Sequence, residues 1–117
     1  MRLSQWLPFG SVPELLAPAL AQALQAPLPP QLVDVRTERE FAAGHIEGAT
    51  SVPVTELAAR LPFLALDPER PVVVICLTAH RSIPAVRLLR GQGLEARQLA
   101  GGMLAWRAAG LPERRGS

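Results

Sequence analysis

The fold is decided by the stretch Pro71-Val72-Val73-Val74-Ile75-Cys76-Leu77-Thr78-Ala79-His80-Arg81-Ser82. Its β-branched run, Val72 to Ile75, predicts a strand that is buried on both faces, as in a parallel sheet covered by helices. Apolar residues at helical spacing follow Ser82 and stop at Gly91-Gln92-Gly93, which predicts a helix between these points. The residues between the strand and the helix must therefore form a short, tight turn, and the expected fold class is α/β.

Cys76 is the only cysteine of the chain, and it opens this turn. A sulfur atom at the junction of a buried strand and a helix can face several backbone N–H groups and the positive helix end, for which Ser82 is the predicted N-cap. Such surroundings lower a thiol pKa to roughly 3.5–7.5, compared with about 8.5 for a free cysteine. A lone cysteine is often an inert buried residue, but Thr78, His80 and Arg81 in the same turn favour a reactive thiolate.

The rest of the sequence predicts strands and helices that alternate along the chain. Thr37 and Glu40 form a predicted capping box at the start of a helix. Pro18 is expected to kink or end the first helix, and Thr55 is expected to cap a later one. The predicted elements are a helix from 13–16 onward, a strand at 32–35, a helix after Thr37, a short strand at Val52, a helix at 56–61, a turn at 67–70, a strand at 96–99 and a helix from 101–102 to 109.

The composition limits what the protein can be. A chain of 117 residues with 49% hydrophobic content suits one globular domain. We predict a leader at 1–10, the domain at 11–112 and a tail at 113–117. Trp106 is expected in the core, whereas Trp6 in the leader could pack or contact a partner. The single cysteine excludes an internal disulfide. Because no stretch resembles a signal peptide or reaches the length of a membrane span, we expect a cytoplasmic protein without membrane contact.

The charges argue against nucleic acid as a partner. All twelve basic residues are arginines, the net charge is only +2, and the arginines are scattered among acidic residues. A nucleic-acid groove needs clustered basic residues, usually with aromatic residues between them. Two histidines and one cysteine, without suitable spacing, give no zinc site. We therefore expect neither a metal nor a cofactor, and a monomeric protein.

Four segments together resemble the rhodanese-like domains, and the likeness runs from about Ser11 to Pro112. They are Leu32-Val33-Asp34-Val35-Arg36 with Glu40-Phe41, Gly44-His45-Ile46-Glu47-Gly48-Ala49, the Cys76 turn, and Leu99-Ala100-Gly101-Gly102-Met103 with Trp106 and Gly110-Leu111-Pro112. The resemblance implies a central parallel sheet of about five strands flanked by helices on both faces. It also implies that Cys76 carries a sulfur atom as a persulfide.

The length of the cysteine turn separates two families that share this architecture. In rhodanese-like sulfurtransferases the loop has six residues starting at the cysteine, whereas phosphatases and arsenate reductases of the Cdc25 type have seven. Here four residues, Leu77 to His80, lie between Cys76 and Arg81. Because a smaller ring of N–H groups suits a sulfur atom better than a tetrahedral phosphate, the resemblance favours sulfur transfer over phosphatase or arsenate reductase chemistry.

Ala79 departs from the family pattern. The loop usually reads Cys-x-x-Gly-x-Arg, and Ala79 occupies the glycine position. A positive φ would strain an alanine by about 1–2 kcal/mol, and so short a loop offers little packing to offset that strain. We therefore expect Ala79 to adopt a negative φ.

Several polar residues in and around these motifs have predicted roles. Asp34, inside an apolar strand, is expected to bind backbone N–H groups or an arginine, with Arg36 the nearest candidate. By resemblance, His45 is a packing position. His80 is expected to shape the electrostatics at the mouth of the site rather than act as a base. Arg81 has two open roles, since it can attract an anionic donor or pair with a carboxylate and brace the loop.

The leading hypothesis is a sulfurtransferase of the thiosulfate sulfurtransferase type that works by double displacement. The Cys76 thiolate attacks the outer sulfur of a sulfane-sulfur donor such as thiosulfate, and sulfite leaves. A small-molecule or protein thiol, or cyanide in an assay, then removes the sulfur. The persulfide is held by N–H groups of the active-site loop, which consists of Leu77, Thr78, Ala79, His80, Arg81 and Ser82. The alternative is a non-catalytic binding or regulatory rhodanese-like module in which Cys76 is vestigial.

Overall fold

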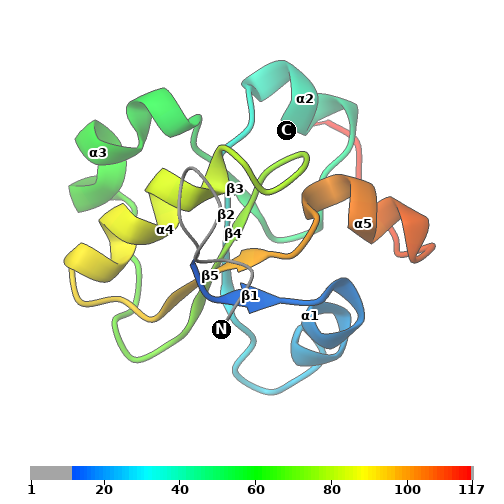
Figure 1. Cartoon of the computed structure of the whole chain (residues 1–117), viewed down its shortest axis with the longest axis horizontal. Coiled ribbons are helices and arrows are strands. Elements are labelled where there is room, and N and C mark those ends of the chain that lie inside the picture. The colour runs from blue at the N-terminus through cyan, green and yellow to red at the C-terminus, as the bar shows by residue number, and fades with distance from the viewer. Residues whose placement is uncertain (1–11, 117) are drawn as a thin grey trace, which may run out of the picture.

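Five parallel strands form the centre of the computed structural model, which describes residues 12–116 (Figure 1). In order across the sheet they are β1 (Glu14–Leu15), β5 (Ala96–Leu99), β4 (Val72–Ile75), β2 (Gln31–Asp34) and β3 (Thr50–Ser51). Every neighbouring pair is parallel, so the chain crosses over the faces of the sheet between strands. The predicted α/β fold with a parallel sheet is confirmed.

Helices cover both faces of this sheet, as predicted. They are α1 (Ala17–Ala23), α2 (Glu38–Ala43), α3 (Leu57–Arg60), α4 (Ser82–Gly91) and α5 (Gly102–Ala108), with the short 3-10 helices η2 (Val54–Glu56) and η3 (Leu61–Phe63) on either side of α3. In Figure 1, α3 and α4 lie on one side of the sheet, and α1 and α5 lie on the other. The sheet is therefore the middle of three layers.

The central strand β4 supplies side chains to both halves of the core. Val72 and Val74 pack on the side of α3 and α4, whereas Val73 and Ile75 pack on the side of α1 and α5, where Trp106 is also buried. All four β4 residues are at most 1% exposed, because alternate side chains of a central strand point into opposite covered faces. The β-branched run thus marks the middle of the sheet, and the predicted core position of Trp106 is confirmed.

The N-terminal part of the described chain differs from the prediction. Glu14–Leu15, expected to start a helix, form the edge strand β1, which pairs with β5 at the register Glu14 to Gln98. The helix α1 then runs without a break from Ala17, with Pro18 in its first turn. The expectation that Pro18 kinks or ends a helix is wrong, because the N–H that proline lacks has no helical partner in a first turn.

Of the helix caps predicted at Thr37 and Thr55, only the first is present. In the capping box at α2, Glu40 N donates to Thr37 Oγ1 at 3.2 Å and Thr37 N donates to Glu40 Oε1 at 3.1 Å, which confirms that prediction. Thr55 lies inside η2 and makes no capping bond, so its predicted role is wrong. Val52, the predicted strand residue, directly follows β3 and is fully buried.

The C-terminal residues fold back onto α2. Arg114 N donates to His45 O at 2.7 Å and His45 N donates to Arg114 O at 2.9 Å, while Gly116 N donates to Ala42 O at 2.9 Å.

The predicted leader 1–10, with Trp6, lies outside the described residues, as does Ser117. Within residues 12–116, no helix combines the length and the apolar composition needed to cross a membrane.

Candidate active site

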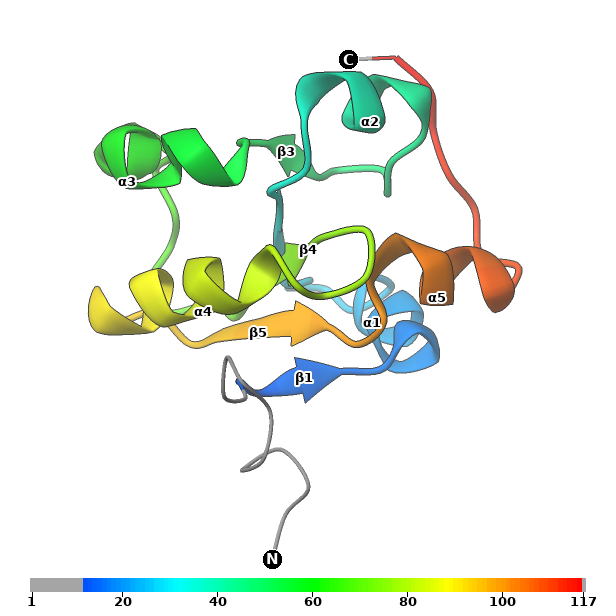
Figure 2. The ribbon, with the colours of Figure 1, turned by 45° about the horizontal axis from the view of Figure 1, so that its top comes forward.

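Cys76 lies at the carboxyl end of β4, where the central strand leads into the turn before α4. The residue is 1% exposed and belongs to the core on the side of α3 and α4. In Figure 2 the loop that follows β4 passes close to the start of α5. Open parallel sheets bind ligands at this edge, because loops from several strands meet there.

The first turn of α5 holds the backbone of the cysteine loop. Met103 N donates to Cys76 O at 2.8 Å, and Leu104 N donates to Leu77 O at 3.1 Å. Gly102, with a φ of 58°, permits this approach, because a Cβ at this position would overlap the carbonyl oxygens of Cys76 and Leu77. The second glycine of the Gly101-Gly102 pair is therefore a point of contact between α5 and the cysteine loop.

The surroundings of the Cys76 sulfur stabilise its thiolate. Burial is the largest single influence and raises the pKa of the thiol. Hydrogen bonds from the N–H groups of Thr78 and Arg81, together with the Arg81 side chain and its charge, lower this pKa, and their combined effect is the greater. The net pKa of Cys76 lies below its ordinary value, in the direction that the sequence predicts. Of the loop N–H groups, those of Thr78 and Arg81 are the ones that act on the sulfur most clearly.

Arg81 links the cysteine loop to α2 through a two-bond ion pair with Glu40. Arg81 Nη1 lies 2.7 Å from Glu40 Oε1, and Nη2 lies 2.9 Å from Oε2. These bonds are the main reason that the pKa of the Glu40 carboxyl is lowered to about 2. Of the two roles left open by the sequence, pairing with a carboxylate is present. The same guanidinium also acts on the Cys76 sulfur.

Ala79 adopts a left-handed conformation, with a φ of 72°. The expectation of a negative φ is wrong. The loop must turn Thr78 N–H and Arg81 N–H toward one sulfur atom, and a left-handed residue within a helical turn produces such a concave group of N–H donors. The site accepts a strain of about 1–2 kcal/mol at this alanine to keep that geometry.

Ser82 is the first residue of α4 rather than its N-cap, so that prediction is also wrong. Arg81 occupies the N-cap position with helical dihedral angles (φ −67°, ψ −18°) and makes no side-chain capping bond. The fully buried Ser82 hydroxyl instead donates to Gln98 Oε1 at 2.6 Å, and Gln98 Nε2 donates to Glu14 Oε2 at 2.8 Å. This polar chain ties the start of α4 to β5 and to the edge strand β1.

His80 lies on the exposed side of the loop. Its Nδ1 atom is 2.9 Å from Thr78 Oγ1, so the His80 side chain restrains Thr78, one of the two residues whose N–H groups act on the sulfur. An electrostatic role of His80 at the mouth of the site stays a prediction. Among residues 12–116 there is no group of three or more His, Cys, Asp or Glu side chains placed to hold a metal ion.

The other polar motif residues form a buried support beneath α2. Asp34 and Arg36 are 0% and 1% exposed and pair through two bonds, Nε to Oδ1 at 2.9 Å and Nη2 to Oδ2 at 2.7 Å. The expected Asp34–Arg36 pairing is thus present. Arg36 Nη2 also donates to Gly44 O at 2.8 Å, and buried His45 stacks on Phe41 with a centroid distance of 3.7 Å. These contacts anchor the end of the helix that carries Glu40.

The sequence comparisons agree with this architecture. The family model described as "Rhodanese-like domain" matches residues 16–109. The chain belongs to this family. A crystal structure of thiosulfate sulfurtransferase from Pseudomonas aeruginosa superposes with a TM-score of 0.82 at 31% identity, covering 91% of this chain and 21% of that one. The alternation of strands and helices predicted from the sequence is therefore the rhodanese-like fold.

Two curated relatives of this rhodanese-like domain differ in size and in name. A sulfurtransferase from Allochromatium vinosum is 35% identical over 102 residues, which cover 86% of this chain and 94% of the relative. An HTH-type transcriptional regulator of Mycobacterium tuberculosis is 48% identical over 83 residues, which cover 69% of this chain and 36% of the relative. The chain spans 36% of the length of this regulator, and 54% and 60% of the lengths of two further curated relatives.

Two residues of this rhodanese-like site were not identified as site residues from the sequence. Glu40 was assigned only to the helix start, although its place in the Glu40-Phe41 motif was a signal. Gly102 is predicted only as the start of the last helix and as part of a segment that resembles the family, although glycine is the residue that permits a close backbone approach. In both cases the partner, Arg81 or the Cys76 carbonyl, is distant in the sequence and is identified only by the fold.

The lowered pKa of Cys76 predicts how its alkylation depends on pH. Because only the thiolate reacts, the rate with iodoacetamide rises with pH and reaches half its plateau at the thiol pKa. We expect this midpoint clearly below the value of about 8.5 for a free cysteine. Arg81→Gln should move the midpoint upward, because the guanidinium stabilises the thiolate. A stopped-flow or quenched time course on the folded protein measures both. A midpoint at or above that of a small free thiol contradicts the prediction.

Proposed function

We propose that this rhodanese-like domain is a sulfurtransferase that moves sulfane sulfur from a donor such as thiosulfate to a thiol acceptor through a persulfide on Cys76. The observation that carries the proposal is the pair of N–H groups, from Thr78 and Arg81, that stabilise negative charge on the buried sulfur. Two relatives named as sulfurtransferases support it, one of them covered almost completely by this chain. The six-residue loop from Cys76 to Arg81 suits a sulfur atom better than a phosphate.

The proposed chemistry needs two displacements at sulfur. In the first, the Cys76 thiolate attacks the outer sulfur of thiosulfate, a new S–S bond forms, and the old one breaks with its electron pair leaving on sulfite. The loop N–H groups then stabilise the persulfide anion, as donors preorganised toward developing charge do. In the second, an acceptor thiolate attacks the outer sulfur, and the electron pair of the broken S–S bond returns to Cys76 as a thiolate.

Intact-mass spectrometry tests the first displacement directly. Reduced protein mixed with thiosulfate, a thiosulfonate or a polysulfide should gain the mass of one sulfur atom, and a thiol or cyanide should remove it. Cys76→Ser should gain nothing, because it lacks the nucleophile. Full occupancy is expected, since the chain contains no second thiol to resolve the persulfide. A wild-type protein that takes up no sulfur from any of these donors would exclude the proposed function.

A second candidate function is a binding or regulatory module, favoured by the 48% identity to part of an HTH-type transcriptional regulator. In that role Cys76 would either hold sulfur without passing it on or take no part. The two functions differ in turnover. A sulfurtransferase releases many equivalents of sulfite per protein when donor and thiol acceptor are both in excess. A module releases at most one.

A further inference from the structure

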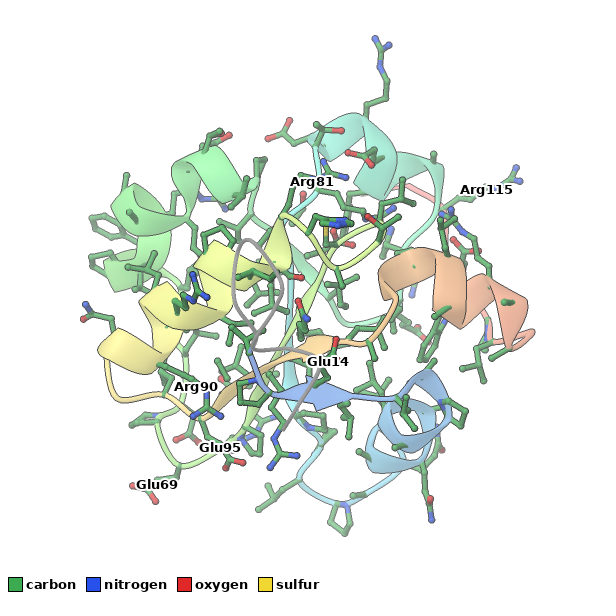
Figure 3. All side chains as sticks on the ribbon, viewed as in Figure 1. Glu14, Glu69, Arg81, Arg90, Glu95 and Arg115 are labelled. Carbon is green, nitrogen blue, oxygen red and sulfur yellow. The ribbon has the colours of Figure 1, made fainter. Side chains whose placement is uncertain are left out.

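The charge of Arg81 meets two partners at once. Among residues 76–82, Arg81 alone carries a permanent charge, and its guanidinium acts on the Cys76 sulfur. Both of its terminal nitrogens are nevertheless bound to the carboxylate of Glu40, at 2.7 and 2.9 Å. Figure 3 shows Arg81 between the cysteine loop and α2, which carries Glu40. A donor that approaches Cys76 therefore meets a paired cation rather than a free one.

The carboxylate of Glu40 is itself fixed in place. Its Oε1 atom accepts hydrogen bonds from Thr37 N and Thr37 Oγ1, both at 3.1 Å, in addition to the bond from Arg81. The geometry with two parallel bonds adds strength and direction to the pair. The Arg81 and Glu40 side chains are 35% and 29% exposed, so the pair lies at the boundary between the site and solvent. The bonds from Thr37 therefore orient the Glu40 carboxylate toward Arg81.

We propose that Glu40 determines the donor specificity of this site, by neutralising Arg81 and so reducing the preference for dianionic over monoanionic sulfur donors. The inference rests on the proposed function. Two donors isolate the effect of charge, because both deliver an outer sulfur through the same bond cleavage. Thiosulfate carries two negative charges and releases sulfite, whereas methanethiosulfonate carries one and releases methanesulfinate. In each case the Cys76 thiolate gains the sulfur and the leaving group takes the electron pair.

The expected size of the effect follows from one unit of charge near the reacting sulfur. Glu40→Gln leaves Arg81 with an uncompensated positive charge, which attracts a dianion more than a monoanion. At a partly exposed site and moderate ionic strength, we expect the ratio of kcat/KM for thiosulfate to kcat/KM for methanethiosulfonate to rise about three- to tenfold. Glutamine can still accept the bond from Thr37 N, so the start of α2 should be retained.

Glu38→Gln is the matched control. Glu38 lies in the first turn of the same helix and is exposed. Its replacement by glutamine changes the net charge by the same amount as Glu40→Gln. Its donor ratio should stay within about twofold of the wild type, because surface charges at a distance are largely screened. Arg81→Gln provides the opposite test, since it leaves Glu40 uncompensated, and the donor ratio should then fall below the wild-type value. If Glu40→Gln does not fold, a donor ratio in Arg81→Gln that stays at the wild-type value overturns the inference, because the charge of Arg81 then has no influence for Glu40 to reduce.

A readout without sulfur transfer separates the inference from the proposed function. Iodoacetate and iodoacetamide alkylate the same thiolate and differ by one negative charge, so their rate ratio at Cys76 reports the local charge. The rate with iodoacetate divided by the rate with iodoacetamide should rise about three- to tenfold in Glu40→Gln and stay unchanged in Glu38→Gln. If the wild type takes up no sulfur, the proposed function fails and the alkylation ratio still tests Glu40. Two results would overturn the inference and leave Glu40 as a structural brace. One is that the donor ratio and the alkylation ratio both stay at their wild-type values in Glu40→Gln. The other is that both ratios rise as much in Glu38→Gln as in Glu40→Gln.

Discussion

Replacing Gly102 by alanine should destabilise the protein by about 2–5 kcal/mol and displace the loop that presents Cys76. Two costs combine. A φ of 58° disfavours any side chain, and the new Cβ would overlap the carbonyl oxygens of Cys76 and Leu77. These carbonyls cannot retreat cheaply, because they accept hydrogen bonds from Met103 N and Leu104 N. Urea unfolding measures the stability. The pH midpoint of Cys76 alkylation should rise, because the loop N–H groups no longer point at the sulfur.

Gly110→Ala is the control for the backbone conformation alone. Gly110 has a φ of 70° and nothing within 4 Å of an added Cβ, so this variant should lose only the cost of a left-handed alanine, about 1–2 kcal/mol. Its alkylation midpoint should match the wild type. If Gly102→Ala and Gly110→Ala lose equal stability and both keep the wild-type midpoint, the contact between α5 and the cysteine loop is not what positions Cys76.

Asp34→Ala should cost about 3–5 kcal/mol, because it leaves the charge of Arg36 buried without its partner. Arg36 is 1% exposed and gives two side-chain bonds to Asp34, at 2.9 and 2.7 Å. Its remaining side-chain bond, to Gly44 O at 2.8 Å, is to a neutral carbonyl and cannot compensate the charge. The transition in urea should shift to lower concentration with little change in slope.

Two further variants show whether burial of the charge is the cause. Adding Arg36→Met to Asp34→Ala removes the unpaired charge and should recover part of the loss, although Gly44 O then lacks its donor. Glu95→Ala breaks the exposed pair with Arg97, whose side chains are 54% and 43% exposed, and should cost less than about 1 kcal/mol. An Asp34→Ala variant no less stable than Glu95→Ala would show that the buried pair contributes little.

The accuracy of the sequence predictions followed how local each interaction is. The β-branched run Val72 to Ile75 was correctly placed as a strand covered on both faces, and the Thr37–Glu40 capping box lies within one helical turn. In both cases the sequence signal that decides the prediction spans only a few residues. Pro18 was misjudged because a proline in a first turn and a proline that ends a helix look alike until the strand pairing of Glu14–Leu15 is known.

The site shows the same division. Cys76 and its loop were recognised from the junction of strand and helix, and the direction of the cysteine pKa followed from that junction. The contact partners of the loop did not follow, because Glu40 and Gly102 lie tens of residues away and meet it only after the sheet has formed. The Ser82 hydroxyl likewise donates to Gln98 on β5 instead of capping α4.

The sequence by itself determined the α/β class, the central strand and the cysteine whose thiolate the loop stabilises, because these depend on composition and spacing along a few turns of chain. Only the tertiary structure decided that Ala79 is left-handed and that Arg81 is paired with Glu40. Both are consequences of directing N–H groups from a short loop toward one buried sulfur while α2 and α5 press on that loop from distant parts of the chain. Such requirements are set by three-dimensional contacts, which local preferences do not encode.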